Sequence, residues 1–231
     1  MKDGEKIFSA LRAAFPFTIP IMTGFCFLGM AYGIYMNVLG FGVLYPTLMA
    51  ALIFGGSLEF VAATMLLAPF APIQTFLVAL MIQARHLFYG LAMLEKYKGL
   101  GLKRQYLIFG LCDETFAINY SARIPEGIDR GWFYFFVTLL NQSYWVFSAM
   151  LGGLLGEMLS FDTNGLDFVM TAMFVVIWLE QFLHEKSHAT DAIGFIASMA
   201  CLIVFGSQSF LIPSMIAILI VLTAFRSRLE K

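Results

Sequence analysis

The sequence predicts an all-α protein that crosses a membrane as a polytopic bundle of seven or eight helices, in a single domain over residues 1–231. Three observations predict this fold class: 60% of the 231 residues are hydrophobic, only 13% are charged, and the mean hydropathy is +0.83. A soluble domain of this size is nearer half apolar and a quarter charged, so an ordinary water-facing surface is excluded. The net charge of −1 gives no electrostatic footprint for DNA or RNA, and no nucleic acid is expected as a partner.

Stretches without charged residues set the lengths of the expected helices. A helix needs about 20 apolar residues to cross a bilayer, and Asp, Glu, Lys and Arg are absent from 13–58, 60–84, 131–156 and 192–225. We expect no cleaved signal peptide, and the first apolar segment is interpreted as a retained span. The expected spans in chain order are 16–37, 42–68, 72–94, 105–122, 132–155, 167–183, 190–206 and 209–225.

The segment 105–122 is the exception among these spans, because it is short and carries Asp113 and Glu114. With the N-terminus inside and eight spans, nine Lys and Arg residues are cytoplasmic and four, all in the loop 96–104, violate the positive-inside rule. With the N-terminus outside and 105–122 re-entrant, ten Lys and Arg residues are cytoplasmic and three are external. The rule leaves both topologies open, and the conflict indicates that a segment before residue 131 is not a plain spanning helix.

Two glycine pairs have helix-packing spacing. Gly29-x-x-x-Gly33 ends the first expected span and Gly152-x-x-x-Gly156 ends the fifth. Gly lets helix backbones approach closely, and we prefer this interpretation. The alternative is an internal repeat of the kind found in transporters.

A broken helix is expected at Gly55-Gly56, inside the second span. Adjacent glycines weaken a helix by about 1 kcal/mol each relative to Ala. A helix that restarts after them presents free amides and a dipole that favour an anion such as a carboxylate. Gly55, Gly56 and Ser57 are therefore candidate substrate-binding residues, and a close-packed glycine pair is the alternative.

Ionisable residues inside the expected spans form the candidate transport site. Each costs about 2.5–3.5 kcal/mol at mid-bilayer on insertion scales, so we expect the group to share a wet cavity or to pair. A structural ion-pair network is the alternative. Arg85 can grip a carboxylate, His86 can change protonation near neutral pH, and adjacent carboxylates favour protonation of one of them. Asn141 is a further candidate contact, or an interhelical hydrogen-bonding group. The ionisable residues are Glu59, Arg85, His86, Asp113, Glu114 and Glu180.

The segment His184-Glu185-Lys186-Ser187-His188 matches the H-E-x-x-H pattern, in which two His residues bind zinc and the Glu acts as a base. An intramembrane zinc metalloprotease is therefore a rival function. Lys186 and Ser187 within the motif and the lack of a second ligand motif favour a solvated loop. Cys26, Cys112 and Cys201 lie in apolar runs and are interpreted as small buried hydrophobes. No metal, cofactor or enzymatic activity is expected.

Three motifs together resemble the AzlC-type family, the large subunit of branched-chain amino-acid exporters, from Pro16 to about Arg226. The family has an amide where this chain has Glu59, and Asn where it has Gln83, and the added charge at Glu59 bears on substrate preference. The motifs are Gly55-Gly56-Ser57-Leu58-Glu59-Phe60, Arg85-His86-Leu87-Phe88-Tyr89-Gly90 and Asp113-Glu114-Thr115-Phe116-Ala117.

The resemblance implies a multi-pass protein of the bacterial inner membrane that exports leucine, isoleucine, valine or related apolar amino acids. It also implies a small four-helix partner subunit of the AzlD type and energy from the proton gradient, with no cofactor. In this hypothesis Arg85 and the amides after Gly55-Gly56 bind the substrate carboxylate. Asp113, Glu114 or Glu59 receives the ammonium group or the coupling proton, His86 relays that proton, and Phe and Met side chains line an apolar pocket. A passive channel and a purely structural membrane subunit are the remaining alternatives.

Overall fold

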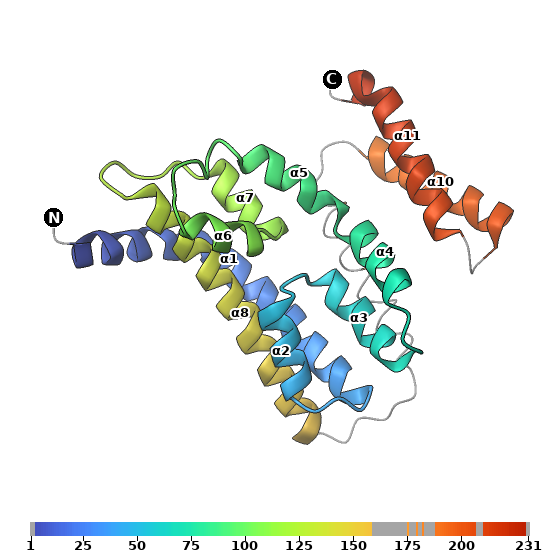
Figure 1. Cartoon of the computed structure of the whole chain (residues 1–231), viewed down its shortest axis with the longest axis horizontal. Helices are drawn as coiled ribbons and strands as arrows, with labels where there is room; N and C mark the ends of the chain where they lie inside the picture. The colour runs from blue at the N-terminus through green and yellow to red at the C-terminus, as the bar shows by residue number, and fades with distance from the viewer. Residues whose placement is uncertain are drawn as a thin grey trace. The chain divides into compact units, whose positions relative to one another are not determined.

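The computed structural model describes residues 3–158, 188–206 and 210–229, together with Val175, Leu179 and Phe182. All ten regular elements in this part of the chain are α-helices and none is a strand, which confirms the all-α prediction. The chain divides into two compact units, 1–166 and 167–231. Figure 1 shows the helices of the first unit from blue to yellow and those of the second in orange and red.

The longest helices of the first unit, α1 (Asp3–Val38) and α8 (Arg130–Met158), pack against each other and run in the same direction. The ring of Phe17, in the first half of α1, lies 5.6 Å from that of Phe133, near the start of α8. Near their ends, a side chain added at Gly156 would meet Asn37 at 2.6 Å. Figure 1 shows the blue and yellow helices side by side along most of their length.

The glycine pairs lie where α1 and α8 touch. A Cβ added at Gly152 would stand 2.7 Å from the Cα of Met30, and one at Gly29 would stand 2.7 Å from the Cβ of Ser148. Real Cβ atoms do not approach so closely, so glycine at these positions lets the two backbones come into contact. The helix-packing interpretation of the GxxxG pairs is confirmed.

The segment expected as one span over 42–68 is broken at the predicted place. It forms α2 (Leu44–Leu52) and α3 (Ser57–Leu67), which we call the first helix pair, and residues 53–56 between them are its tip. Phe54 and Gly56 have positive φ angles of 47° and 40°. This left-handed backbone stops α2 and lets the chain turn before α3 begins.

The next two segments are also divided. The expected span 72–94 forms α4 (Pro72–Ile82) and α5 (Ala84–Met93), which are bent by 52° at Gln83. The short segment 105–122 forms α6 (Lys103–Phe109) and α7 (Asp113–Ser121), which we call the second helix pair, with residues 110–112 as its tip. A single helix over 105–122 is therefore wrong.

The core of the first unit lies between the first half of α1, the end of α5, α6, α7 and the start of α8. Its members are apolar or aromatic and bury almost all of their surface, which supplies most of the favourable packing here. They are Ala10, Ala14, Met93, Tyr97, Leu107, Leu111, Ile118, Phe133, Tyr134, Phe136 and Val137.

The second unit contains α10 (Ala189–Phe205) and α11 (Leu211–Leu229), which pack against each other. They match the expected spans 190–206 and 209–225. The expected span 167–183 lies outside the described residues apart from the three single positions.

Among the described helices, one is by itself long and apolar enough to cross a bilayer, over Gly4–Val38 of α1. The bent pair α4 and α5 passes the same test when its two helices are taken together. The expected total of seven or eight spans is therefore not established by helix length. Exposed apolar side chains are nevertheless abundant, as on α4, where Ile73 is 77% exposed and Phe76 65% exposed.

Candidate functional site

Glu59 holds the tip of the first helix pair. Its side chain is fully buried in the first turn of α3, and its Oε1 accepts hydrogen bonds from the Gly55 N–H at 2.9 Å and from Trp145 Nε1 at 3.0 Å. A buried carboxylate needs such donors to replace water. The Gly55 amide, predicted from the sequence to face a substrate carboxylate, thus bonds to a carboxylate of the chain itself.

Gln83 connects this tip to the bend between α4 and α5. Its Nε2 donates to the Gly55 carbonyl oxygen at 3.4 Å, and a side chain on Gly55 would overlap the Gln83 amide. Glycine at position 55 therefore leaves room for the Gln83 amide to approach the backbone closely. The substrate-binding candidates Gly56 and Ser57 follow directly at the start of α3, where both are partly exposed.

Arg85, two residues after Gln83, pairs with the tip of the second helix pair. Its Nη2 lies 2.9 Å from Asp113 Oδ2, and both side chains are 36% exposed. Asp113 is the first residue of α7, where the free backbone amides also stabilise a negative charge. The ion pair therefore joins α5 to α7 in a position that solvent or a ligand can reach.

Several polar atoms around this ion pair are buried and have no hydrogen-bond partner in the described part of the chain. They include a donor on Arg85 and an acceptor on Asp113, as well as one ring nitrogen of His86. Such atoms are uncommon in folded proteins, because burial without a partner forfeits the hydrogen bonds that water would make. They are Gln83 Oε1, Arg85 Nε, His86 Nδ1 and Asp113 Oδ1.

The middle of α8 contacts both helix pairs. Asn141 Nδ2 donates to Thr115 Oγ1 of α7 at 3.2 Å, and its Oδ1 is buried without a partner in the described residues. Gln142 Nε2 donates to the Ala51 carbonyl oxygen at the end of α2, at 3.0 Å. Gln142 Oε1 accepts from the Tyr106 hydroxyl of α6 at 2.6 Å. One side chain thus bridges the two helix pairs.

Aromatic rings continue the site along α5 and α7. The His86 ring lies edge-on to Tyr89 with centroids 5.5 Å apart, and Tyr89 stacks on Phe116 at 4.3 Å. Glu114 is partly buried in the first turn of α7, next to Asp113. The face made by α5 and α7 therefore combines charged groups with flat apolar surfaces.

The predicted residues are thus brought together in two adjoining groups. Glu59 lies with the first tip, whereas Arg85, His86, Asp113 and Glu114 lie at the second, and Gln83 stands between the groups. Glu180 and residues 184–187 of the H-E-x-x-H motif lie outside the described residues. Within the residues described, no group of three or more His, Cys, Asp or Glu side chains is placed to hold a metal ion.

Sequence reasoning did not assign Trp145 a role in the site, and it interpreted Gln142 only as part of a polar patch that could form interhelical hydrogen bonds. Trp145 lies in an apolar run and Gln142 in a polar patch, and their partners are far away in the chain. The spacing of Asn141, Gln142 and Trp145 on one helix was the available signal, since residues three and four apart share a face.

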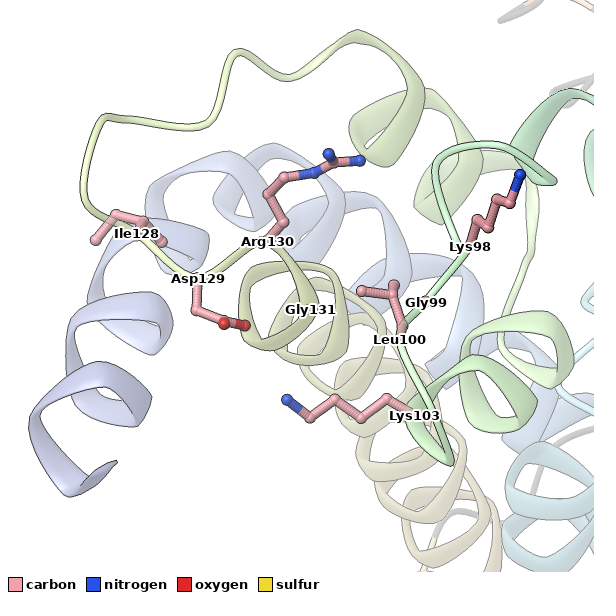
Figure 2. Close-up of a pocket in the computed structure, with 8 residues that line it drawn as sticks. All are labelled: Lys98, Gly99, Leu100, Lys103, Ile128, Asp129, Arg130 and Gly131. Carbon is pink, nitrogen blue, oxygen red and sulfur yellow. The ribbon is translucent and has the colours of Figure 1, made fainter. Parts of the chain in front are cut away.

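A pocket of about 490 Å³ lies away from these groups, at the start of α8. Figure 2 shows Lys98 and Lys103 reaching from the loop after α5 and the start of α6, with Arg130 and Asp129 on the opposite side. Lys103 Nζ stands 3.6 Å from the centre of the Trp132 ring. The pocket is lined by Lys98, Gly99, Leu100, Lys103, Ile128, Asp129, Arg130 and Gly131.

Comparison with known proteins identifies the family. The family model described as AzlC protein matches residues 20–159, which include both tips, Arg85 and the middle of α8. The chain belongs to the AzlC family. No solved structure matches it.

Relatives of this AzlC-family chain cover almost its whole length. The branched-chain amino acid transport protein AzlC of Bacillus subtilis (strain 168) is 55% identical over 100% of this chain and 91% of the relative. An uncharacterized membrane protein of Haemophilus influenzae is 50% identical over 99% of this chain and 94% of the relative. An uncharacterized membrane protein of Helicobacter pylori (strain ATCC 700392 / 26695) is 35% identical over 98% of this chain and 99% of the relative. The chain is therefore a membrane protein with a transport role.

Proposed function

We propose that this protein is a secondary transporter that exports branched-chain or related apolar amino acids across the bacterial inner membrane. The observation that carries the proposal is the half-exposed ion pair between Arg85 and Asp113, which keeps one unused donor and one unused acceptor. The name of the Bacillus subtilis relative supports the substrate class.

An amino acid carries a carboxylate and an ammonium group on neighbouring atoms, and the ion pair offers a partner for each. The carboxylate accepts hydrogen bonds from Arg85, whose planar guanidinium suits a two-pronged contact. The ammonium group donates to Asp113 Oδ1. Asn141, Gly56 and Ser57 contribute further polar contacts from α8 and the first tip. Tyr89, Phe116 and neighbouring Phe and Met side chains receive the apolar side chain.

Proton coupling is assigned to acidic residues and His86. Asp113 and Glu114 are adjacent at the start of α7, and two carboxylates side by side favour protonation of one of them. His86 follows Arg85 directly and relays the proton. Glu59 is a further proton carrier in this scheme. When its carboxylate takes up a proton, it gives up the hydrogen bonds that it accepts from Gly55 and Trp145. Two opposite transmembrane gradients, of substrate and of protons, are thereby linked at one site.

A small four-helix subunit of the AzlD type is the proposed partner. The exposed apolar faces of α4 and α5, with Ile73, Phe76 and Leu91 each at least 65% exposed, offer contact area for lipid and for such a subunit. Efflux that requires co-expression of the AzlD-type chain, together with recovery of both chains in one complex, supports the partnership. Full efflux by the large chain alone contradicts it.

The function is tested by loading cells with a leucine-containing dipeptide and measuring leucine efflux. Arg85→Gln removes the charge that holds the substrate carboxylate, and charge-assisted hydrogen bonds contribute about 1.5–3 kcal/mol each. We therefore expect efflux to fall by about tenfold to a hundredfold at equal expression. The control is Arg104→Gln, the same substitution at an exposed residue of α6. Undiminished efflux by Arg85→Gln removes Arg85 from the mechanism.

A further inference from the structure

Four parts of the first unit meet at one end of the α1–α8 pair. Lys96, in the loop after α5, donates from Nζ to the backbone carbonyl oxygens of Asn119 and Tyr120 at the end of α7. Arg130, at the start of α8, donates to the Lys96 carbonyl oxygen at 3.3 Å. Lys103, the first residue of α6, lies over the Trp132 ring of α8. The second helix pair therefore begins and finishes at the same end.

The tip of the second helix pair reaches into the middle of the unit. Gly110 packs so closely on Thr138 that an added Cβ would overlap the threonine methyl group. Thr115, one turn into α7, bonds to Asn141. Thr138 and Asn141 lie eight and eleven residues after Arg130, which is about 12–17 Å along a helix. This depth is roughly half of a bilayer core.

The first helix pair starts from the opposite end. The Val43 N–H, just before α2, donates to Glu157 Oε1 near the end of α8 at 3.0 Å. The end of α2 bonds to Gln142 through the Ala51 carbonyl oxygen. With nine and eleven residues, α2 and α3 are about 14 and 17 Å long, so each covers only half of the bilayer core.

The bent pair α4–α5 fixes where α3 must finish. Its 22 residues over 72–93 have a helical path of about 33 Å, which the 52° bend shortens to about 30 Å, enough for one crossing. The pair leads to Tyr97, whose ring contacts Tyr134 near the start of α8. Because α5 arrives at this end, α4 begins at the opposite end, and α3 returns to the end from which α2 started. Figure 1 shows α2 leading through a short connection into α3, with α4 following directly from α3.

Positive charge marks one of the two ends. Apart from Arg85, every Lys and Arg in the described part of the first unit belongs to the start of α1 or to the segment 96–130. The segments 13–84 and 131–185 contain no Lys or Arg at all. The positive-inside rule therefore places this end in the cytoplasm. The residues are Lys6, Arg12, Lys96, Lys98, Lys103, Arg104, Arg123 and Arg130.

We propose that the N-terminus is cytoplasmic and that two re-entrant helix pairs enter from opposite faces of the membrane, 44–67 from outside and 103–121 from the cytoplasm. Their tips come together at the bend near Gln83 and the middle of α8. Gln83 bonds to the first tip and Arg85 to the second. The transport site then lies between a tip open to the outside and a tip open to the cytoplasm. This last step rests on the proposed function.

This topology differs from both alternatives left open by the sequence, and four positions separate all three. Single cysteines are placed at Gly40, Phe70, Lys98 and Glu126 after Cys26, Cys112 and Cys201 are replaced by Ser. All four positions are exposed. An impermeant maleimide is added to spheroplasts, and labelling after permeabilisation confirms that each cysteine is present and reactive.

The opposed pairs require that positions 40 and 70 are labelled from outside and that positions 98 and 126 are labelled only after permeabilisation. Eight plain spans with a cytoplasmic N-terminus give labelling at 40 and 98 instead. An external N-terminus with one re-entrant segment gives labelling at 70 alone. Either of these patterns overturns the proposal. Labelling does not depend on leucine efflux, so failure of the topology and failure of the transport function are observed separately.

Discussion

Glu59 is the most completely buried acid described in the first unit, and its position depends on one donor from its own helix pair and one from a distant part of the chain. Gly55 and Trp145 together supply the hydrogen bonds that replace its water. An ionised group in a low-dielectric interior is very costly without such partners. The carboxylate therefore ties the first tip to α8 and also maintains the turn at Gly55.

Replacing Glu59 tests this role. Glu59→Leu keeps an apolar stem but leaves the Gly55 N–H and the Trp145 indole N–H without an acceptor. Each unsatisfied buried donor costs about 1–3 kcal/mol. We expect a clear fall in the midpoint of thermal unfolding in detergent, and a smaller fall for Glu59→Gln, which keeps one acceptor oxygen.

The matched control is Glu126→Gln in the exposed loop before α8, where a surface change of this kind stays within about 0.5 kcal/mol. If Glu59→Leu unfolds at the same temperature as the parent protein, the two hydrogen bonds do not hold the first tip.

Individual charges were predictable from the sequence, and so was Arg85 as the counter-charge of Asp113, but the partners of Glu59 were not. The cost of an ion in lipid identified Arg85, Asp113 and Glu59 as linked residues. Their pairing depends on the path of the chain: Asp113 pairs with Arg85, whereas Glu59 bonds to an indole 86 residues away. Hydrogen bonds across such separations leave no local pattern, which is why Trp145 and the partners of Gln142 were missed.

Helix breaks were easier to predict than helix directions. Gly55-Gly56 gave the first tip because adjacent glycines weaken a helix whatever surrounds it. The second tip, at Gly110–Cys112, has only one glycine, and its break also depends on the close contact with Thr138. The direction of a helix after a break is set by packing, so the return of α3 could not be read from composition, whereas the Lys and Arg count left a re-entrant 105–122 open.

The α1–α8 contact provides a prediction at the scale of elements. Gly152→Val forces side-chain atoms into the Met30 backbone, and overpacking of this kind costs about 1–3 kcal/mol. We expect a lower thermal midpoint and less folded protein in the membrane fraction. Gly24→Ala in α1 is the control, because a Cβ there meets nothing within 4 Å. A helix gains up to about 1 kcal/mol from Ala in place of Gly. Equal effects of the two changes contradict this packing.

Gln142 provides a second prediction, because its two hydrogen bonds join the first and second helix pairs. Gln142→Leu has a similar volume and removes both bonds. We expect a lower maximal rate of leucine efflux, with a smaller change in the substrate concentration for half-maximal rate, since the substitution acts on the two tips and not on the substrate contacts.

Ser143→Ala is the control for Gln142→Leu. Ser143 is exposed, and its hydroxyl donates to the Leu139 carbonyl oxygen of its own helix. Gln142→Glu keeps the acceptor for Tyr106 and loses the donor to Ala51, so its rate lies between those of the parent protein and Gln142→Leu. Parental rates in all three variants exclude a bridging role.

For the molecule as a whole, ligand binding to the native state raises stability. A ligand at one hundred times its Kd stabilises by about 2.7 kcal/mol. We expect leucine at such a concentration to raise the thermal midpoint of the parent protein but not of Arg85→Gln. Leucinamide lacks the carboxylate and 4-methylpentanoate lacks the ammonium group, so both are expected to have little effect. Stabilisation by either analogue as strong as by leucine contradicts a site that binds both charges.

The parallel contact between α1 and α8 has a consequence for biosynthesis. The glycine face of α1 leaves the ribosome long before its partner, because all residues from Val38 to Arg130 are translated between them. Until α8 arrives, that face is covered only by lipid, by the insertion machinery or by a chaperone. Ribosomes that stall within this interval therefore release chains in which the helix contact is incomplete.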